Sequence, residues 1–213
     1  MKIRTTLDLS ESLDTALAWR RRELHAVVAS AQACRDSFKE PTCRAAYLII
    51  YAHWEGFVKE AATAYLQFVS RQRVPYKDLK TNFVAIASYN SIRQAASSGK
   101  NFLYSQVVDF LFHNSAERSR IPFAGVIDTE SNLKSEVLEN IVFTIGLDSD
   151  CSFKTKHVFI DRELLKRRNR IAHGEREPVT FSELSEAKNQ VDSMLVEFKT
   201  HLENFAVAKA YLR

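Results

Sequence analysis

Glycine and clustered histidine are scarce in this chain of 213 residues. Its five glycines stand far apart, so the sequence contains no glycine-rich loop of the kind that cradles phosphates in nucleotide-binding proteins. No two of its six histidines are three or four positions apart, and no Asp, Glu and His residues show the spacing of a metal site. The sequence therefore disfavours Walker-type and Rossmann-type nucleotide sites and a hydrolase with its own metal, and it predicts no cofactor.

Cysteines and long apolar runs are also few. The three cysteines, Cys34, Cys43 and Cys151, include no C-x-x-C pair, which argues against a disulfide framework and against a zinc site. No apolar run approaches the roughly 18 residues of a membrane-spanning helix. The N-terminal segment MKIRTTLDLSESLD also lacks the apolar core of a secretory signal. We therefore expect a soluble, cytoplasmic protein that does not associate with membranes.

Hydrophobic and charged residues are abundant, at 46% and 26% of the chain. This balance allows enough apolar burial to offset chain entropy, and the length favours a single domain over residues 1–213. The net charge of +4 suits a nucleic-acid partner but equally suits an ordinary soluble protein. Basic residues gather at Arg20–Arg22 and, more densely, at Lys166–Arg170. A solvated helix face is the simplest explanation of either cluster taken alone.

Two long amphipathic helices are predicted in the first third of the chain. From about residue 10 to residue 38 apolar residues recur at helical spacing, and Pro41 marks the expected end of this helix. Thr42 is the expected cap of a second helix. The apolar stripe of the second helix comprises Cys43, Tyr47, Ile50, Trp54, Phe57, Ala61, Tyr65 and Phe68. The short link predicts that the two helices pack as an antiparallel pair.

The region of about 75–130 is interpreted as a variable, irregular insertion. The stretches SYNSIRQAASSGKN and RSRIPFAGVID interrupt the helical period on either side of one plausible helix, NFLYSQVVDFLFHN. In that helix Val107, Phe110 and Leu111 are candidates for the core. The alternation of Phe102, Tyr104 and Gln106 leaves a strand as an alternative.

The helical period returns in the last third. A helix is expected from about Ser131 to Ile145, followed by Gly146 as its C-terminal cap. Asp161 is the expected cap of a helix that Gly174 ends, and Thr180 or Ser182 begins a final helix. The fold class is therefore all-α, as a bundle of at least five helices.

Chemically distinctive residues crowd the end of one predicted helix, in LLKRRNRIAHGE. The simplest explanation is that cations near a helix C-terminus complement its dipole, each worth about 0.3 to 1 kcal/mol when exposed. The spacing of Arg168 and His173 is weak by itself, since Arg20 and His25 share it. The second copy is distinguished by its context, with Asn169 directly after the arginine and Ala-His-Gly at the end.

This segment resembles the signature of the HEPN superfamily, in which an arginine, usually a polar residue, a few further positions and a histidine follow one another. YAHWEGFVKEAA in the second helix resembles the bacterial branch grouped with the RiboL-PSP type. The final segment TFSELSEAKNQVDSMLVEFKTHLENF is similar to that branch too. The resemblance implies a core of four to five helices, a face-to-face homodimer and an endoribonuclease site built from both protomers.

The resemblance also implies roles for individual residues. Arg168 would stabilise the pentacoordinate phosphorane, His173 would act as general base or acid, and Asn169 would orient one of them or the phosphate. Histidine exchanges protons near neutral pH, and a guanidinium can grip two phosphate oxygens. The ribose 2′-hydroxyl would attack its own phosphodiester without a metal, so the substrate would be RNA. Lys166, Arg167 and Arg170 would hold the RNA backbone.

Helix geometry limits how these groups can meet. Two positions five apart on an ideal helix diverge by roughly 140°. Either the last turn unwinds at His173, as Gly174 permits, or a second chain completes the site. Arg167 remains an alternative holder of the phosphate.

Glu55, in the HWEG segment, lies off the apolar stripe of the second helix. It is a candidate for orienting His173 or Arg168, although a surface pairing with Lys59 explains it as well. Close packing of another helix explains the neighbouring Gly56. One HEPN branch carries a modified tyrosine two residues after the histidine. Glu175 stands there in this chain, so that mode of control is doubtful.

Three functions follow from the resemblance. The first is an endoribonuclease in bacterial defence or a toxin, with a cognate inhibitor or a defence-system protein as its partner. The second is a noncatalytic HEPN module that binds RNA or protein. The third is a plain helical dimerisation scaffold, which would require RNRIAH to be buried or to face away from any cleft.

Overall fold

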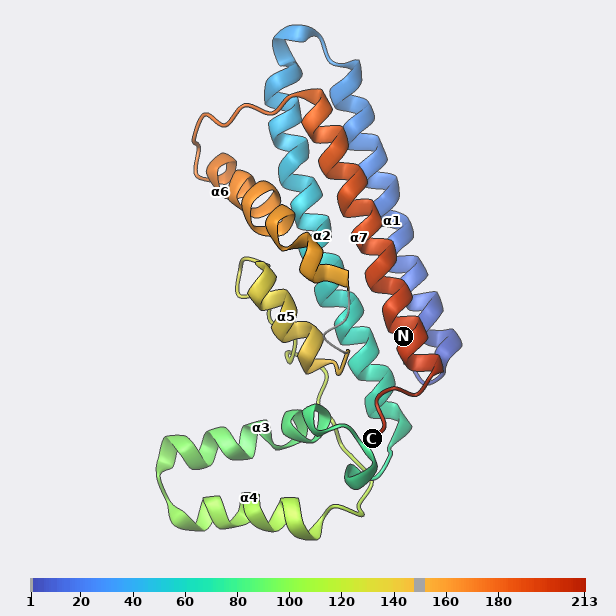
Figure 1. Cartoon of the computed structure of the whole chain (residues 1–213), viewed down its shortest axis with the longest axis vertical. Helices are drawn as coiled ribbons and strands as arrows, with labels where there is room; N and C mark the ends of the chain where they lie inside the picture. The colour runs from blue at the N-terminus through green and yellow to red at the C-terminus, as the bar shows by residue number, and fades with distance from the viewer. Residues whose placement is uncertain (1, 148–151) are drawn as a thin grey trace.

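The computed structural model describes residues 2–147 and 152–213, and within these ranges it contains seven α-helices and no strand. The all-α class is therefore confirmed. Three long helices, α1 (Thr6–Ala33), α2 (Asp36–Gln72) and α7 (Phe181–Val207), lie side by side along the long axis of the molecule (Figure 1). The chain reverses between α1 and α2, so these two helices form the predicted antiparallel pair.

The predicted stripe of α2 forms the centre of the core. All eight of its residues are buried: Cys43, Tyr47, Ile50, Trp54, Phe57, Ala61, Tyr65 and Phe68. Because α1 and α7 both pack against α2, further residues of α2 are buried beside the stripe. The structure thereby confirms the apolar period of this helix.

The boundary between α1 and α2 lies earlier than predicted. α1 ends at Ala33, and Pro41 lies inside α2. The helix accommodates this proline because the carbonyl it leaves unpaired belongs to Ser37, an exposed residue near the helix end that water can reach. Thr42 is not a cap, since its hydroxyl donates to the Phe38 carbonyl at 2.7 Å within the helix.

The middle of the chain is more helical than predicted. After a short 3₁₀ turn, η1 (Tyr76–Asp78), it forms a hairpin of α3 (Thr81–Ser98) and α4 (Asn101–His113) at one end of the long axis (Figure 1). Most of SYNSIRQAASSGKN is therefore helix, and the break comprises only Gly99, which has a left-handed φ of 64°, and Lys100. This stretch has few apolar residues because little of α3 is buried, so its sequence shows no clear helical period.

α4 confirms the helical interpretation of NFLYSQVVDFLFHN over the strand. Of the three residues expected to join the core, Phe110 packs against it, although α4 contributes no fully buried residue. Phe110 is partly buried, with its ring centroid 5.1 Å from that of Tyr76, whereas Leu111 is 47% exposed. The segment RSRIPFAGVID is irregular, as predicted.

The helices that lead to the candidate site come next. They are α5 (Ser135–Thr144), the 3₁₀ turn η2 (Ser152–Lys156), the π-helix η3 (Phe159–Leu165) and α6 (Lys166–Ala172). Cys151 lies outside the described residues. In the part of the chain that the structure covers, no helix has both the length and the apolarity needed to cross a membrane.

The predicted cap at Asp161 was wrong. Asp161 lies inside η3, and its carboxylate accepts hydrogen bonds from the backbone N–H and the hydroxyl of Ser135, at 2.8 and 2.5 Å. It therefore satisfies the start of α5 instead of the start of its own helix. By contrast, the predicted cap of α7 is confirmed. Thr180 forms a reciprocal capping box with Glu183.

Gly146, two residues after the end of α5, provides a test of the packing between this helix end and α3. Its φ is 73°, and an added Cβ would lie 3.0 Å from Asn82 Nδ2 and 3.1 Å from a ring carbon of Phe83. Gly99 has a similar φ but no described atom within 4 Å of such a Cβ. Gly99→Ala should lower the free energy of unfolding by about 1 kcal/mol through backbone strain alone. Gly146→Ala should lower it by about 1 to 3 kcal/mol more, because it also overpacks the site.

Urea denaturation of the two variants measures this difference. Equal losses of stability would show that the Asn82 and Phe83 side chains shift to make room for the added Cβ without a further loss of free energy.

Candidate functional site

A groove of about 460 Å³ lies between α2 and α6. Its lining residues are Leu48, Tyr51, Ala52, Glu55, Gly56, Lys59, Thr129, Arg168 and Ala172. Two segments that are far apart in the sequence, HWEG on α2 and RNRIAH on α6, therefore meet in one place. Lys59 and Arg168 supply its positive charge and Glu55 its negative charge.

The guanidinium of Arg168 is held from several sides. Its Nη1 donates to the amide oxygens of Asn132 and Asn169, at 3.0 and 2.7 Å. Its Cζ lies 4.0 Å from the centre of the Tyr51 ring, within the range of a cation–π contact. Its Nη2 is 3.4 Å from Glu55 Oε2, which is long for a hydrogen bond but close enough for electrostatic attraction. The side chain remains 23% exposed, so part of the guanidinium is accessible.

Glu55 contacts Arg168, one of the two residues it was expected to orient. Its other oxygen, Oε1, accepts a hydrogen bond from the Thr129 hydroxyl at 2.7 Å. Within the described residues Glu55 makes no ion pair with Lys59, the surface partner that the sequence offered as an alternative. Burial is the main cause that raises the pKa of the Tyr51 hydroxyl, and the neighbouring Glu55 raises this pKa further.

Sequence reasoning missed Thr129 and Asn132 as site residues. Both come from the loop before α5, in which Glu130 and Ser131 have φ values of 52° and 63°. Residues other than glycine seldom adopt this left-handed conformation, so the loop that carries Thr129 to the groove and Asn132 to Arg168 is strained. These residue types are common in loops, and no motif distinguishes them there.

His173 lies just outside the groove. α6 ends at Ala172, and His173 has a φ of −84° and a ψ of 5°. Gly174 follows with a φ of 81°, and the N–H groups of Gly174 and Glu175 bond back to the carbonyls of Ile171 and Arg170. This is a Schellman motif, which confirms Gly174 as the helix end. The imidazole is exposed and has no hydrogen bond or ion pair within the described part of the chain.

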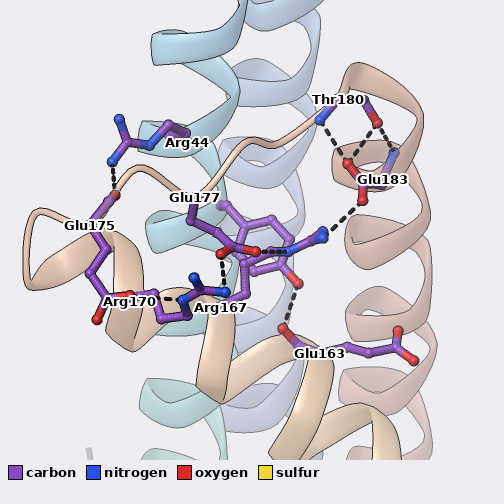
Figure 2. Close-up of polar contacts among 9 residues, drawn as sticks. Arg44, Glu163, Arg167, Arg170, Glu175, Glu177, Thr180 and Glu183 are labelled. Atoms are coloured by element: carbon purple, nitrogen blue, oxygen red, sulfur yellow. Dashed lines mark hydrogen bonds and ion pairs between the residues drawn. The ribbon is translucent and has the colours of Figure 1, made fainter.

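Arg167 and Arg170 do not line the groove of Arg168 but a different cavity. Figure 2 shows both arginines pointing toward Glu177. Arg167 pairs with Glu177 at 3.2 Å and Glu183 at 2.8 Å. Arg170 pairs with Glu175 at 2.8 Å and Glu177 at 2.5 Å. Hydrogen bonds from Thr180 and Arg167 lower the pKa of Glu183. The charges of both arginines are thus matched by carboxylates of the chain itself.

These two arginines line a second cavity of about 360 Å³ together with Lys166 and Tyr47. Tyr47, from α2, donates a hydrogen bond to the Glu163 carbonyl at 3.0 Å, and burial raises the pKa of its hydroxyl to about 12. Lys166 is exposed and has no ion pair among the described residues. The predicted site residues therefore divide between two sides of α6.

The other arginine and histidine with the same spacing serve a different purpose. Arg20 is buried, donates to the Ala16 carbonyl at 2.8 Å and pairs with Glu60 at 2.9 Å. A Cβ added at Gly56 would lie 3.4 Å from Arg20 Nη2, an ordinary van der Waals contact, so Arg20 packs beside this glycine without requiring it. Arg20 therefore helps to hold the helix pair together.

Comparisons with known proteins assign the family. Neither a curated protein nor a solved structure matches the chain. A family model described as MAE_28990-like HEPN matches residues 9–211, which include both RNRIAH and HWEG. This description does not test the predicted RiboL-PSP-like branch, which stays a prediction. Since the match spans almost the whole chain and agrees with the all-α fold, the protein belongs to the HEPN superfamily.

Proposed function

We propose that this protein is a metal-independent endoribonuclease that cleaves RNA through attack by the ribose 2′-hydroxyl. The observation that supports this proposal most is that the guanidinium of Arg168 is held in place and remains partly accessible. It is held in an open groove by two amide side chains and an aromatic ring. Arg168 precedes by five positions an exposed histidine whose imidazole has no partner among the residues that the structure describes. This reaction requires a fixed cation to stabilise the phosphate charge and a group that can take and give a proton.

Arg168 would bind the scissile phosphate through one edge of its guanidinium. Nη1 is occupied by Asn132 and Asn169, whereas Nη2 has only contacts of 3.4 and 3.5 Å, to Glu55 and the Ser131 carbonyl. Its Nε–H has no partner among residues 2–147 and 152–213. The Nε–Nη2 edge is therefore able to donate two parallel hydrogen bonds to phosphate oxygens. Asn169 would orient the arginine, which is one of the roles the resemblance implied for it.

His173 would carry the proton. As a base it takes the proton of the 2′-hydroxyl while the oxygen forms a bond to phosphorus. As an acid it gives a proton to the 5′-oxygen as the phosphorus–oxygen bond breaks. The products are a 2′,3′-cyclic phosphate and a 5′-hydroxyl, and no oxidant, water or metal enters the balance. Negative charge developing on the phosphate oxygens is stabilised by Arg168.

The complete site would need a second chain. Ala172 lines the groove of Arg168, but His173 does not. A homodimer whose two-fold axis passes close to α6 would bring the histidine of one chain toward the arginine of the other. Lys166, which is exposed, would hold the RNA backbone on the other side of α6, where it lines the second cavity. The role would be cytoplasmic, in defence or as a toxin, under the control of an inhibitor or partner protein.

Cleavage of a short RNA in excess chelator tests the proposal. The wild-type protein should cleave it to products that end in 2′,3′-cyclic phosphate, identified by mass spectrometry, and should leave the all-deoxy counterpart intact. His173→Ala should lower the rate by about 10²- to 10⁴-fold through loss of proton transfer. His25→Ala is the matched control, because His25 is also exposed and follows Arg20 at the same spacing.

Cleavage that the chelator abolishes would contradict the mechanism. Cleavage that survives His173→Ala would contradict the site. Binding of RNA without cleavage would favour the noncatalytic module.

A further inference from the structure

We infer that Glu177 is a positioning residue for His173, acting through the turn that follows α6. This inference rests on the proposed function of His173. It concerns the side of α6 that carries Arg167 and Arg170. There the chain leaves α6, and the loop that follows is bonded back to the same helix (Figure 2).

The carboxylate of Glu177 is the centre of this arrangement. The residue is only 9% exposed, and its two oxygens reach different arginines of α6. Oε1 is 3.2 Å from Arg167 Nε, and Oε2 is 2.5 Å from Arg170 Nη1. Arg167 and Arg170 are one turn apart on the helix, so Glu177 bridges the last turn before His173. Burying a carboxylate costs free energy, which pairing with these two arginines offsets.

Further contacts fix the same loop on either side of Glu177. Arg44 of α2 donates to the Glu175 carbonyl at 2.6 Å, and the Glu175 side chain accepts from Arg170 Nε at 2.8 Å (Figure 2). The loop then enters α7 at Thr180, whose partner Glu183 also holds Arg167. The residues after His173 are thereby anchored on three helices, α2, α6 and α7.

These contacts constrain the backbone that carries His173 and leave its imidazole free. The histidine stands between the helix end and Gly174, at the point where the chain turns. If the loop moved, the imidazole would move with it relative to Arg168. A displacement of about 1 Å at a reacting group can lower a rate by about 100-fold. Glu177 therefore affects the rate of the reaction through the position of His173, without contacting the substrate.

This inference gives Arg167 and Arg170 a new role. The sequence suggested that they hold the RNA backbone, but in the structure Glu175, Glu177 and Glu183 match their charges. In our proposal both arginines secure the turn. When Glu177 is neutralised, Arg167 keeps Glu183 and Arg170 keeps Glu175. The helices should therefore remain folded while the turn loosens.

Glu177→Gln tests the inference, because it removes the charge and keeps the shape. In the full-length protein the kcat for RNA cleavage should fall by about 10- to 100-fold, with KM unchanged, because geometry and not binding is lost. Amide hydrogen exchange over 173–177 should become faster, while exchange in α2 and α7 stays the same. Glu177→Asp, which keeps the charge, should recover part of both properties.

Glu186→Gln is the matched control. Glu186 lines the same cavity from α7, and its side chain contacts Gln190 instead of the loop. It should leave both kcat and exchange unchanged.

Each remaining outcome overturns the inference. An unchanged kcat and unchanged exchange in Glu177→Gln would show that the contact is dispensable. A loss of kcat without faster exchange would mean that Glu177 acts on the substrate, and global loss of helix would mean that it serves the fold. If the wild-type protein does not cleave RNA, the proposed function fails, and unchanged exchange would then separately reject the anchoring of the turn.

Discussion

Replacing Arg168 with alanine should lower the rate of RNA cleavage by about 10²- to 10³-fold, the usual cost of removing a group that stabilises charge in the transition state. The guanidinium is held before substrate arrives by Asn132, Asn169 and Tyr51, so it needs little reorganisation when charge develops. Cleavage rates with saturating RNA, measured in excess chelator, give the comparison.

Arg168→Lys separates charge from shape. Lysine keeps the positive charge but loses the planar fork and the stacking on Tyr51, so it should recover little of the rate. Glu55 keeps its hydrogen bond from Thr129 in both variants, and circular dichroism should show an intact helical fold. Arg22→Ala, in the exposed part of the other basic cluster, is the control for lost charge alone. A rate undiminished in Arg168→Ala would end the assignment of this residue.

Mixing the two inactive variants should restore activity. If the arginine of one chain works with the histidine of the other, a heterodimer of Arg168→Ala and His173→Ala holds one intact site. Random pairing makes half of the molecules heterodimers, each with one of its two sites restored, so about a quarter of the wild-type rate is expected from a two-fold dimer. The prediction follows from the groove, which Arg168 lines and His173 does not.

The variants should be mixed under conditions that exchange subunits, and each variant alone serves as the blank. Wild-type protein mixed with a double variant, which carries both Arg168→Ala and His173→Ala, is the control for dilution of active chains. If the mixture of single variants stays as inactive as its components, arginine and histidine of the same chain form the site. The unwinding of the last turn at His173 would then be sufficient to bring them together.

The sequence predicted local structure well where periodicity was strong. The stripe of α2 is buried in full, the NFLYSQVVDFLFHN segment is a helix, and Thr180 and Gly174 mark the helix ends expected of them. Two predicted helix boundaries were wrong because the tertiary environment overrode the usual local role of the residue. Pro41 is tolerated inside α2 because the carbonyl it leaves unpaired is exposed, and the Asp161 carboxylate serves α5 instead of its own helix.

The two sides of α6 show what local patterns omit. The sequence marked Lys166, Arg167, Arg168 and Arg170 as one basic cluster, although consecutive helix positions point about 100° apart. Only packing separates them. Arg168 faces α2 and the groove, whereas Arg167 and Arg170 face three carboxylates that follow α6 in the chain. Equal charges in one motif therefore meet different surroundings.

The sequence by itself determined the helical class and the buried stripe of α2, and it predicted a functional site at the segment RNRIAH. Helical period and capping are properties of neighbouring residues, so they can be read along the chain. Tertiary structure alone decided that Glu55 and Asn132 hold Arg168, that Arg20 is buried and that Glu177 ties back the turn after His173. These contacts join residues from separate elements, and their free energy depends on burial and orientation that exist only once the helices have packed.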